Sequence, residues 1–104
     1  MISRHWRGVV KTEKSDDYIS HLQKDTFPQL GNIPGFVSAS ILRRSTAQGV
    51  EFVVVTTWHS MDAIRQFTGE PADMAVVPPV AQAMMVEYDK KVVHYEIAYT
   101  YQRE

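Results

Sequence analysis

His94 is the side chain in this chain of 104 residues that is best suited to acid–base chemistry. It lies in an apolar-rich stretch, Val92 to Tyr101, and shares a strand face with Glu96, two residues later. An imidazole titrates near neutral pH, so His94 can act as a general base toward a phenol or hydroquinone. Deprotonation makes such a ring electron-rich enough to react directly with oxygen. The alternative is a structural histidine that forms a hydrogen bond at a dimer interface.

Two arginines, Arg7 and Arg43, fall within stretches that have the composition of strands. A guanidinium group makes planar, paired hydrogen bonds, so either side chain can orient an anionic or carbonyl-bearing substrate. A salt bridge at an interface is the more common use of such a residue. Both interpretations stay open from the sequence.

The other histidines give weaker signals. His59 precedes a helix-capping Ser60 and His21 has polar neighbours, so both are predicted to face solvent, whereas His5 could face the interior of a barrel. No two histidines stand four residues apart, and no histidine–carboxylate cluster is present, so we predict no metal site.

The sequence lacks the motifs of several function classes. The sequence has no glycine-rich phosphate loop after a strand, no serine elbow and no basic stripe interleaved with aromatic residues. The formal charge of -1 gives no net attraction for nucleic acid or an anionic membrane. We therefore expect no cofactor, no nucleic acid and no membrane, and a small apolar or aromatic ligand instead.

Composition sets the class of protein. An apolar fraction of 44% and a charged fraction of 22% are typical of a globular protein. The chain has no cysteine, and Met1 to Val10 lacks the continuous apolar run of a signal peptide. We expect a cytoplasmic protein.

The spacing of apolar residues predicts the elements that position these side chains. A helix begins before Tyr18 and ends near Pro28, and Ser60 caps a second helix over Met61–Phe67. Val80 to Met85 is also predicted to be helical. Alternating or continuous apolar residues predict four strands: Ile2–Val10, Phe36–Arg44, Glu51–Trp58 and Val92–Tyr101.

This order, β-α-β-β-α-β, predicts an α+β, ferredoxin-like fold with a four-stranded antiparallel sheet and helices on one face. Glu51–Trp58 and Val92–Tyr101 carry large apolar side chains on both faces. A monomer would expose an apolar sheet surface larger than soluble monomers usually tolerate. We therefore expect a homodimer that pairs the two sheet faces around a twofold axis.

Four segments resemble antibiotic biosynthesis monooxygenase (ABM) domains, and the similarity covers nearly the whole chain. They are Trp6-Arg7-Gly8, Pro34-Gly35-Phe36, Thr57 to Phe67, and Val92-Val93-His94-Tyr95-Glu96. The resemblance implies one domain over residues 1–104 and a dimeric α/β barrel. It also implies relatives of three kinds: cofactor-independent monooxygenases of quinols and polyketides, haem-degrading enzymes, and members without assigned activity.

The resemblance places Trp58 near a cavity between sheet and helices, although a tryptophan at a strand end is also a common core residue. With Phe67, Trp6 and Arg7, Trp58 would bind the substrate, and His94 would be the catalytic base. The predicted function is a cofactor-independent monooxygenase of a small aromatic or quinol-like compound.

Two alternatives remain. A non-catalytic dimeric ligand-binding or stress-related domain is favoured by the shortage of paired polar groups, because Glu96 is the only obvious partner for His94. A haem-degrading oxygenase is disfavoured, because the positions that match its functional residues carry Gly8 or Arg7, Phe67 and a residue near Val77. No histidine lies between His59 and His94, where the axial ligand would fall.

Overall fold

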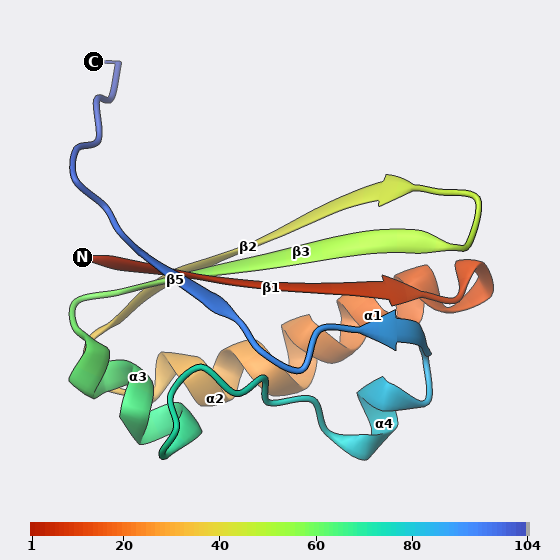
Figure 1. The fold of residues 1–104 in the computed structure, drawn as a ribbon, viewed down its shortest axis with the longest axis horizontal. Helices are drawn as coiled ribbons and strands as arrows, with labels where there is room; N and C mark the ends of the chain where they lie inside the picture. The colour runs from red at the N-terminus through yellow and green to blue at the C-terminus, as the bar shows by residue number, and fades with distance from the viewer. Residues whose placement is uncertain (104) are drawn as a thin grey trace.

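The structure is a computed structural model that describes residues 1–103; Glu104, with which the predicted domain ends, lies outside the described residues. Five strands form one antiparallel sheet in the order β2-β3-β1-β4, and β5 also pairs with β1. The strands are β1 (Ile2–Val10), β2 (Phe36–Ser45), β3 (Val50–Trp58), β4 (Met85–Tyr88) and β5 (Val93–Glu96). The predicted α+β, ferredoxin-like arrangement is confirmed, and the helices lie together on one side of the sheet (Figure 1).

The last strand differs from its prediction. Two short strands, β4 and β5, share the fourth position of the sheet, because both pair with β1. Met85 already belongs to β4, so the helix predicted over Val80–Met85 is shorter and is replaced by α4 (Pro79–Gln82). Regular pairing ends at Glu96, and the chain beyond it extends away from the helical layer (Figure 1).

The first helical region runs further than predicted. It contains η1 (Thr12–Lys14), α1 (Ser15–His21), the π-helical segment η2 (Leu22–Thr26) and α2 (Phe27–Gly31). Pro28 therefore does not end the helix. It stands in the first turn after the wider π-helical turn, where a missing N–H is tolerated.

The second helix matches its prediction closely. α3 spans Met61–Thr68, and the Ser60 hydroxyl accepts a hydrogen bond of 3.2 Å from the Ala63 N–H. This bond satisfies one of the free N–H groups at a helix start. Within residues 1–103, no helix is long and apolar enough to cross a bilayer.

Alternation along the central strand β1 gives the sheet a helix-facing side and an open side. Trp6 and Val10 point toward the helices, with Arg4 between Ile2 and Trp6 on that side. Gly8 also belongs to this side: a Cβ added there would lie 2.4 Å from Trp6 Cη2. The group that approaches Gly8 closely is thus the indole of Trp6.

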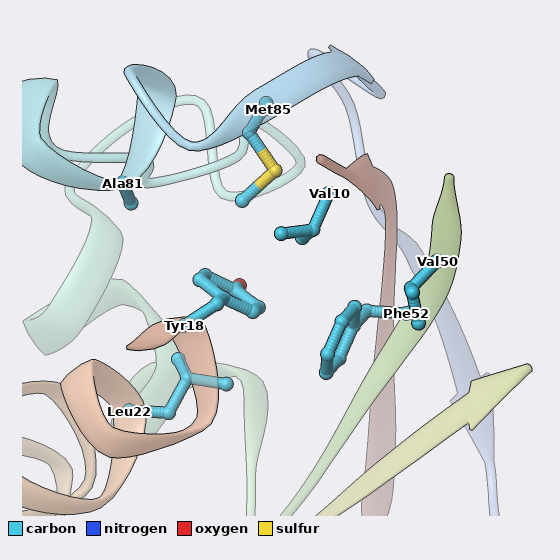
Figure 2. Close-up of a cluster of buried hydrophobic side chains, with 7 residues drawn as sticks. All are labelled: Val10, Tyr18, Leu22, Val50, Phe52, Ala81 and Met85. Carbon is cyan, nitrogen blue, oxygen red and sulfur yellow. The ribbon is translucent and has the colours of Figure 1, made fainter. Parts of the chain in front are cut away.

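Two clusters of buried side chains hold the helices on the sheet. In the first, Tyr18 and Leu22 of the helical region point toward Phe52 of β3 (Figure 2). The Tyr18 and Phe52 rings meet edge to face with their centroids 5.0 Å apart. The second cluster lies at the other end of β3 and contains Leu30, Trp58, Ala63 and Ile64.

The open side of the sheet carries apolar side chains without a covering layer. Leu42, Val93 and Tyr95 are 54%, 51% and 54% exposed. Leu42 pairs with Val53 of β3 and Tyr95 with Ser3 of β1. We refer to Leu42, Val53, Val93 and Tyr95 as the open-face patch.

Candidate functional site

A cavity of about 70 Å³ lies between the helix-facing side of the sheet and the first helical region. Its sheet wall is formed by Arg4, Trp6, Val54 and Thr56. The opposite wall comes mainly from the first helical region, and Phe67 of α3 joins the segment 76–78 to close one side. Most of the lining is apolar, so the few polar side chains decide what the cavity can bind.

Arg4 is the charged residue of the lining, and it is 5% exposed. Its Nη1 donates to the carbonyl oxygen of Ala72 at 2.7 Å, and its Nη2 donates to that of Met74 at 3.0 Å. The guanidinium carbon lies 5.8 Å from the centroid of the Phe67 ring. Burial lowers the pKa of Arg4 to about 10, so the group stays cationic at neutral pH.

His94 stands directly behind this guanidinium. Arg4 and His94 are register partners on β1 and β5, and 2.9 Å separates Arg4 Nη1 from His94 Nε2. Because arginine can only donate, Nε2 accepts, and the imidazole carries its proton on Nδ1. Burial, reinforced by the positive charge of Arg4, lowers the pKa of His94. The predicted base is therefore uncharged at neutral pH, and it is not part of the cavity lining.

Trp58 lies one layer behind the cavity wall. Its side chain is 0% exposed, and its indole N–H donates to Thr56 Oγ1 at 2.9 Å. Its ring stacks on Phe67 with centroids 6.2 Å apart. Thr56 and Phe67 both line the cavity, so Trp58 fixes two lining residues without lining the cavity itself.

Trp6 and Phe67, by contrast, do line the cavity. The Trp6 indole N–H donates to the Asp89 carbonyl oxygen at 3.0 Å, which fixes the ring across Gly8. Tyr18 and Phe27 also line the cavity, so aromatic rings face the space from the sheet, the first helical region and α3.

The helical wall contributes polar groups that the sequence did not identify. His21, predicted to face solvent, is half-buried and lines the cavity together with Thr26. Their side chains, five residues apart, approach to 3.4 Å across the π-helical segment. π-helical turns are frequent at functional sites. Burial raises the pKa of the Tyr18 hydroxyl, which therefore stays protonated.

The two arginines predicted from the sequence, Arg7 and Arg43, lie outside the cavity. Arg7 is on the open side of the sheet, where its Nε contacts Glu51 at 2.7 Å and its other nitrogens face Glu87 and Asp89. Arg43 contacts Asp16 at 3.2 Å. Both form salt bridges within the chain, whereas the alternative interpretation had been a salt bridge at an interface. No group of three or more His, Cys, Asp or Glu side chains among residues 1–103 is arranged to hold a metal ion.

An outer chamber of about 230 Å³ adjoins the cavity. Thr26, Phe67 and the segment 76–78 line both spaces. The two spaces therefore adjoin along these residues.

The chain is similar to known proteins in sequence and in fold. The family model described as antibiotic biosynthesis monooxygenase matches residues 1–76. No curated protein matches the chain. Among solved structures, SnoaB, a cofactor-independent oxygenase from Streptomyces nogalater, superposes with a TM-score of 0.64 and 19% identity, covering 95% of this chain and 94% of its own.

Two further structures are similar in fold. A monooxygenase of Streptomyces coelicolor in complex with nanaomycin D has a TM-score of 0.64 and 16% identity, covering 99% of this chain and 92% of its own. The haem degrader MhuD of Mycobacterium tuberculosis, with two haems in its active site, has a TM-score of 0.62 and 15% identity, covering 98% of this chain and 100% of its own. At these identities the likeness concerns the fold alone.

Proposed function

This chain belongs to the antibiotic biosynthesis monooxygenase family, and we propose that it is a cofactor-independent monooxygenase of a small aromatic or quinol-like compound. The observation that carries the proposal is the largely apolar cavity between sheet and helices, with the Trp6 and Phe67 rings in its walls. Aromatic rings favour planar apolar ligands, and a few fixed polar groups orient them.

The size of the cavity limits the ligand. An engineered cavity of about 150 Å³ is known to hold one benzene molecule, and this cavity is about 70 Å³. A single aromatic ring therefore requires some lining side chains to move, and a polycyclic ligand requires more. The segment 76–78, which also borders the outer chamber, is the wall that can yield with least disturbance of the sheet.

His94 is the proposed base. It is uncharged at neutral pH, as a base must be, but its Nε2 lone pair is engaged by Arg4. A phenolic hydroxyl would have to replace the Arg4 N–H at Nε2, pass its proton to the imidazole and leave its oxygen beside the guanidinium. The electron-rich ring then reacts with O2 at a ring C–H carbon: one oxygen atom is added to that carbon, the other leaves as water, and the ring supplies all four electrons.

The test is oxygen consumption with small quinols under air. Wild-type protein is expected to accelerate oxidation, and Val77→Phe, which fills the cavity from its lining, is expected to abolish the acceleration. Val80→Phe is the matched control, because Val80 is exposed on α4 and outside the lining. His94→Ala is expected to lower the rate by about 100-fold or more, as loss of a general base does; an unchanged rate would rule out His94 as the base.

A homodimer through the open-face patch is part of this proposal. The patch supports it because three of its side chains are about half exposed on the uncovered side of the sheet. Burial of such surface stabilises association by about 25 cal/mol per Å² before the entropic cost of pairing.

The non-catalytic alternative has its own observation. His94, the one residue predicted to be catalytic, is outside the cavity lining, and so are Trp58 and Arg7, two of the four residues predicted to bind substrate. Thermal stabilisation by aromatic compounds without any oxygen consumption would favour this alternative.

Haem fits the described residues poorly. A macrocycle is much larger than a cavity of about 70 Å³, and His21 on the helical wall is the histidine that lines it. The other three histidines of residues 1–103 lie outside the lining. We therefore assign no step to haem.

A further inference from the structure

The cavity wall contains a buried positive charge that has no direct carboxylate contact among residues 1–103, and the more distant Asp73 only partly opposes the lowering of the Arg4 pKa by burial. No Asp or Glu of residues 1–103 forms a salt bridge with Arg4. Its acceptors are two uncharged carbonyl oxygens and the imidazole of His94. Buried ions are normally paired, because desolvation is otherwise uncompensated. An anion in the cavity would supply this missing compensation.

The guanidinium group of Arg4 also has N–H donors without an acceptor among residues 1–103. It carries five N–H bonds, and residues 1–103 accept two from Nη1 and one from Nη2. The remaining two lie on Nε and Nη2, neighbouring nitrogens that can hold both oxygens of one carboxylate. No buried side-chain polar atom of the described residues is both sealed and unpaired, so Nε, which has no partner among residues 1–103, keeps some exposure to solvent.

The existing contacts hold the guanidinium in place. The carbonyl oxygens of Ala72 and Met74 and the Nε2 of His94 fix three of its N–H bonds, and the Phe67 ring lies against it. A donor that is already ordered loses little conformational entropy when a ligand binds. Next to it, Trp6 and Val54 offer an apolar surface for a ring.

We propose that Arg4 binds the oxyanion of an aromatic ligand in this cavity, either a ring carboxylate or a phenolate. The choice of an aromatic ring rests on the proposed function, whereas the need for negative charge rests on Arg4 alone. The substrate class thus narrows from aromatic compounds in general to those that are ionised when bound. A phenol would gain this stabilisation only after losing its proton, which favours the reactive form.

The experiment is calorimetric titration of the full chain with matched probes. Benzoate and benzamide have nearly the same shape and differ in charge, and 4-nitrophenol is titrated at pH values on either side of its own pKa. We expect benzoate to bind roughly ten times more tightly than benzamide or better, the gain typical of a charge-assisted hydrogen bond. The nitrophenol is expected to bind more tightly once ionised.

Variants assign the effect to Arg4. Arg4→Met should remove the preference for charged probes. Arg4→Lys should keep a reduced preference, because an ammonium group retains the positive charge but lacks the paired N–H donors of a guanidinium group. Arg65→Met is the control: it removes a positive charge from an exposed position of α3 that pairs with Asp62 and Glu70 outside the cavity lining. It should leave the preference intact.

The outcomes separate this inference from the proposed function. A preference for benzoate alone supports the carboxylate source, and one for the nitrophenolate alone supports the phenolate source. Equal affinity of wild-type protein for charged and uncharged probes overturns the inference, and this comparison needs no variant to fold. If the protein consumes no oxygen with quinols but still prefers charged probes, the oxygenase proposal is refuted and the anion site is supported.

Discussion

At the scale of single residues, the contact between Arg4 and His94 determines the electrostatics of the cavity. Neither side chain has a carboxylate within salt-bridge distance among the described residues. His94 is one of three uncharged acceptors for Arg4, beside the carbonyl oxygens of Ala72 and Met74. The arrangement requires a neutral imidazole, because a protonated one would place a second positive charge 2.9 Å from the first.

This requirement predicts a pH-dependent stability. Burial and the charge of Arg4 lower the pKa of His94 in the folded state, and Asp73 opposes this only in part. Between the folded pKa and the unfolded value of about 6.5, the unfolded chain binds more protons. The contribution of His94 is therefore complete above about pH 6.5 and is lost as the pH falls below that value.

The melting temperature measures this effect. Wild-type protein should lose more stability between about pH 7.5 and about pH 5 than His94→Gln, which keeps a hydrogen-bond acceptor for Arg4 but cannot titrate. His59→Gln, at an exposed position before α3, is the control and should follow the wild type. Parallel curves for wild type and His94→Gln would contradict the prediction.

A second prediction concerns Gly8. In Gly8→Ala, the new Cβ would lie 2.4 Å from Trp6 Cη2, so the indole must move and lose its hydrogen bond to the Asp89 carbonyl oxygen. We expect a loss of about 1–3 kcal/mol in the free energy of unfolding, measured by urea denaturation.

Gly31→Ala is the matched control for Gly8→Ala. An added Cβ at Gly31 would have no neighbour within 4 Å, and the residue ends α2. This variant should be neutral or slightly more stable. Equal stability of the Gly8 and Gly31 variants would show that the contact with Trp6 is not tight.

Much of the cavity could be predicted from single positions, but not its charge. Trp6 and Phe67 were expected to shape the cavity, and both line it. Arg4 was not identified, although it alternates onto the same strand face as Trp6. A charged residue on an otherwise apolar face was the available signal. Arg7 had been predicted to bind substrate, but its side chain points to the open side of the sheet, away from the cavity.

At the scale of elements, the helices show where sequence patterns stop being informative. The predicted α3 was recovered because its start carries a capping serine and its apolar residues repeat at helical spacing. The π-helical segment has no comparable signature, and its wider turn brings His21 and Thr26 into the cavity wall. A helix predicted with regular geometry left His21 on the surface.

The cap of α3 is open to a direct test. Ser60→Ala removes the acceptor for the Ala63 N–H, and the protein should lose about 1 kcal/mol of unfolding free energy. Because α3 carries Phe67, its fraying should also weaken aromatic ligand binding. Ser45→Ala, at the exposed end of β2, should change neither quantity, and the same measurements apply. A Ser60→Ala protein as stable as wild type would refute the importance of the cap.

The edge formed by β4 and β5 could be predicted only in part. The sequence predicted one strand over Val92–Tyr101, because apolar residues alternate along that whole stretch. Ladder pairing with β1 stops at Glu96, opposite Ile2, and one further hydrogen bond, from the Ile97 N–H to the Met1 carbonyl oxygen at 3.0 Å, brings this edge to the first residue of the sequence. The length of a strand is thus set by its neighbour as well as by its own residues.

At the scale of the whole molecule, the open-face patch bears on assembly. If two copies pair through it, a charge in its centre should break the pairing, because a buried unpaired charge is costly. Leu42→Lys is expected to shift the protein to a monomer in analytical ultracentrifugation. Leu42 is 54% exposed in a single copy, so the substitution should not disturb the fold.

Val80→Lys provides the comparison. Val80 is exposed to the same extent, 54%, but lies on α4 on the helical side of the molecule. It should keep the assembly state of the wild type. A wild-type protein that sediments as a monomer would remove the basis for pairing through this patch.

The place of β1 in the sheet also has a consequence for the timing of folding. β1 is the first strand of this sheet to leave the ribosome, yet β4 and β5, its partners on one side, leave last, and Arg4 meets His94 across 90 positions. Until β4 and β5 have been synthesised, one edge of β1 stays unpaired, and pairings this remote form slowly. A nascent chain therefore remains open to association with its neighbours on a polysome, and we expect its yield during translation to depend on chaperones.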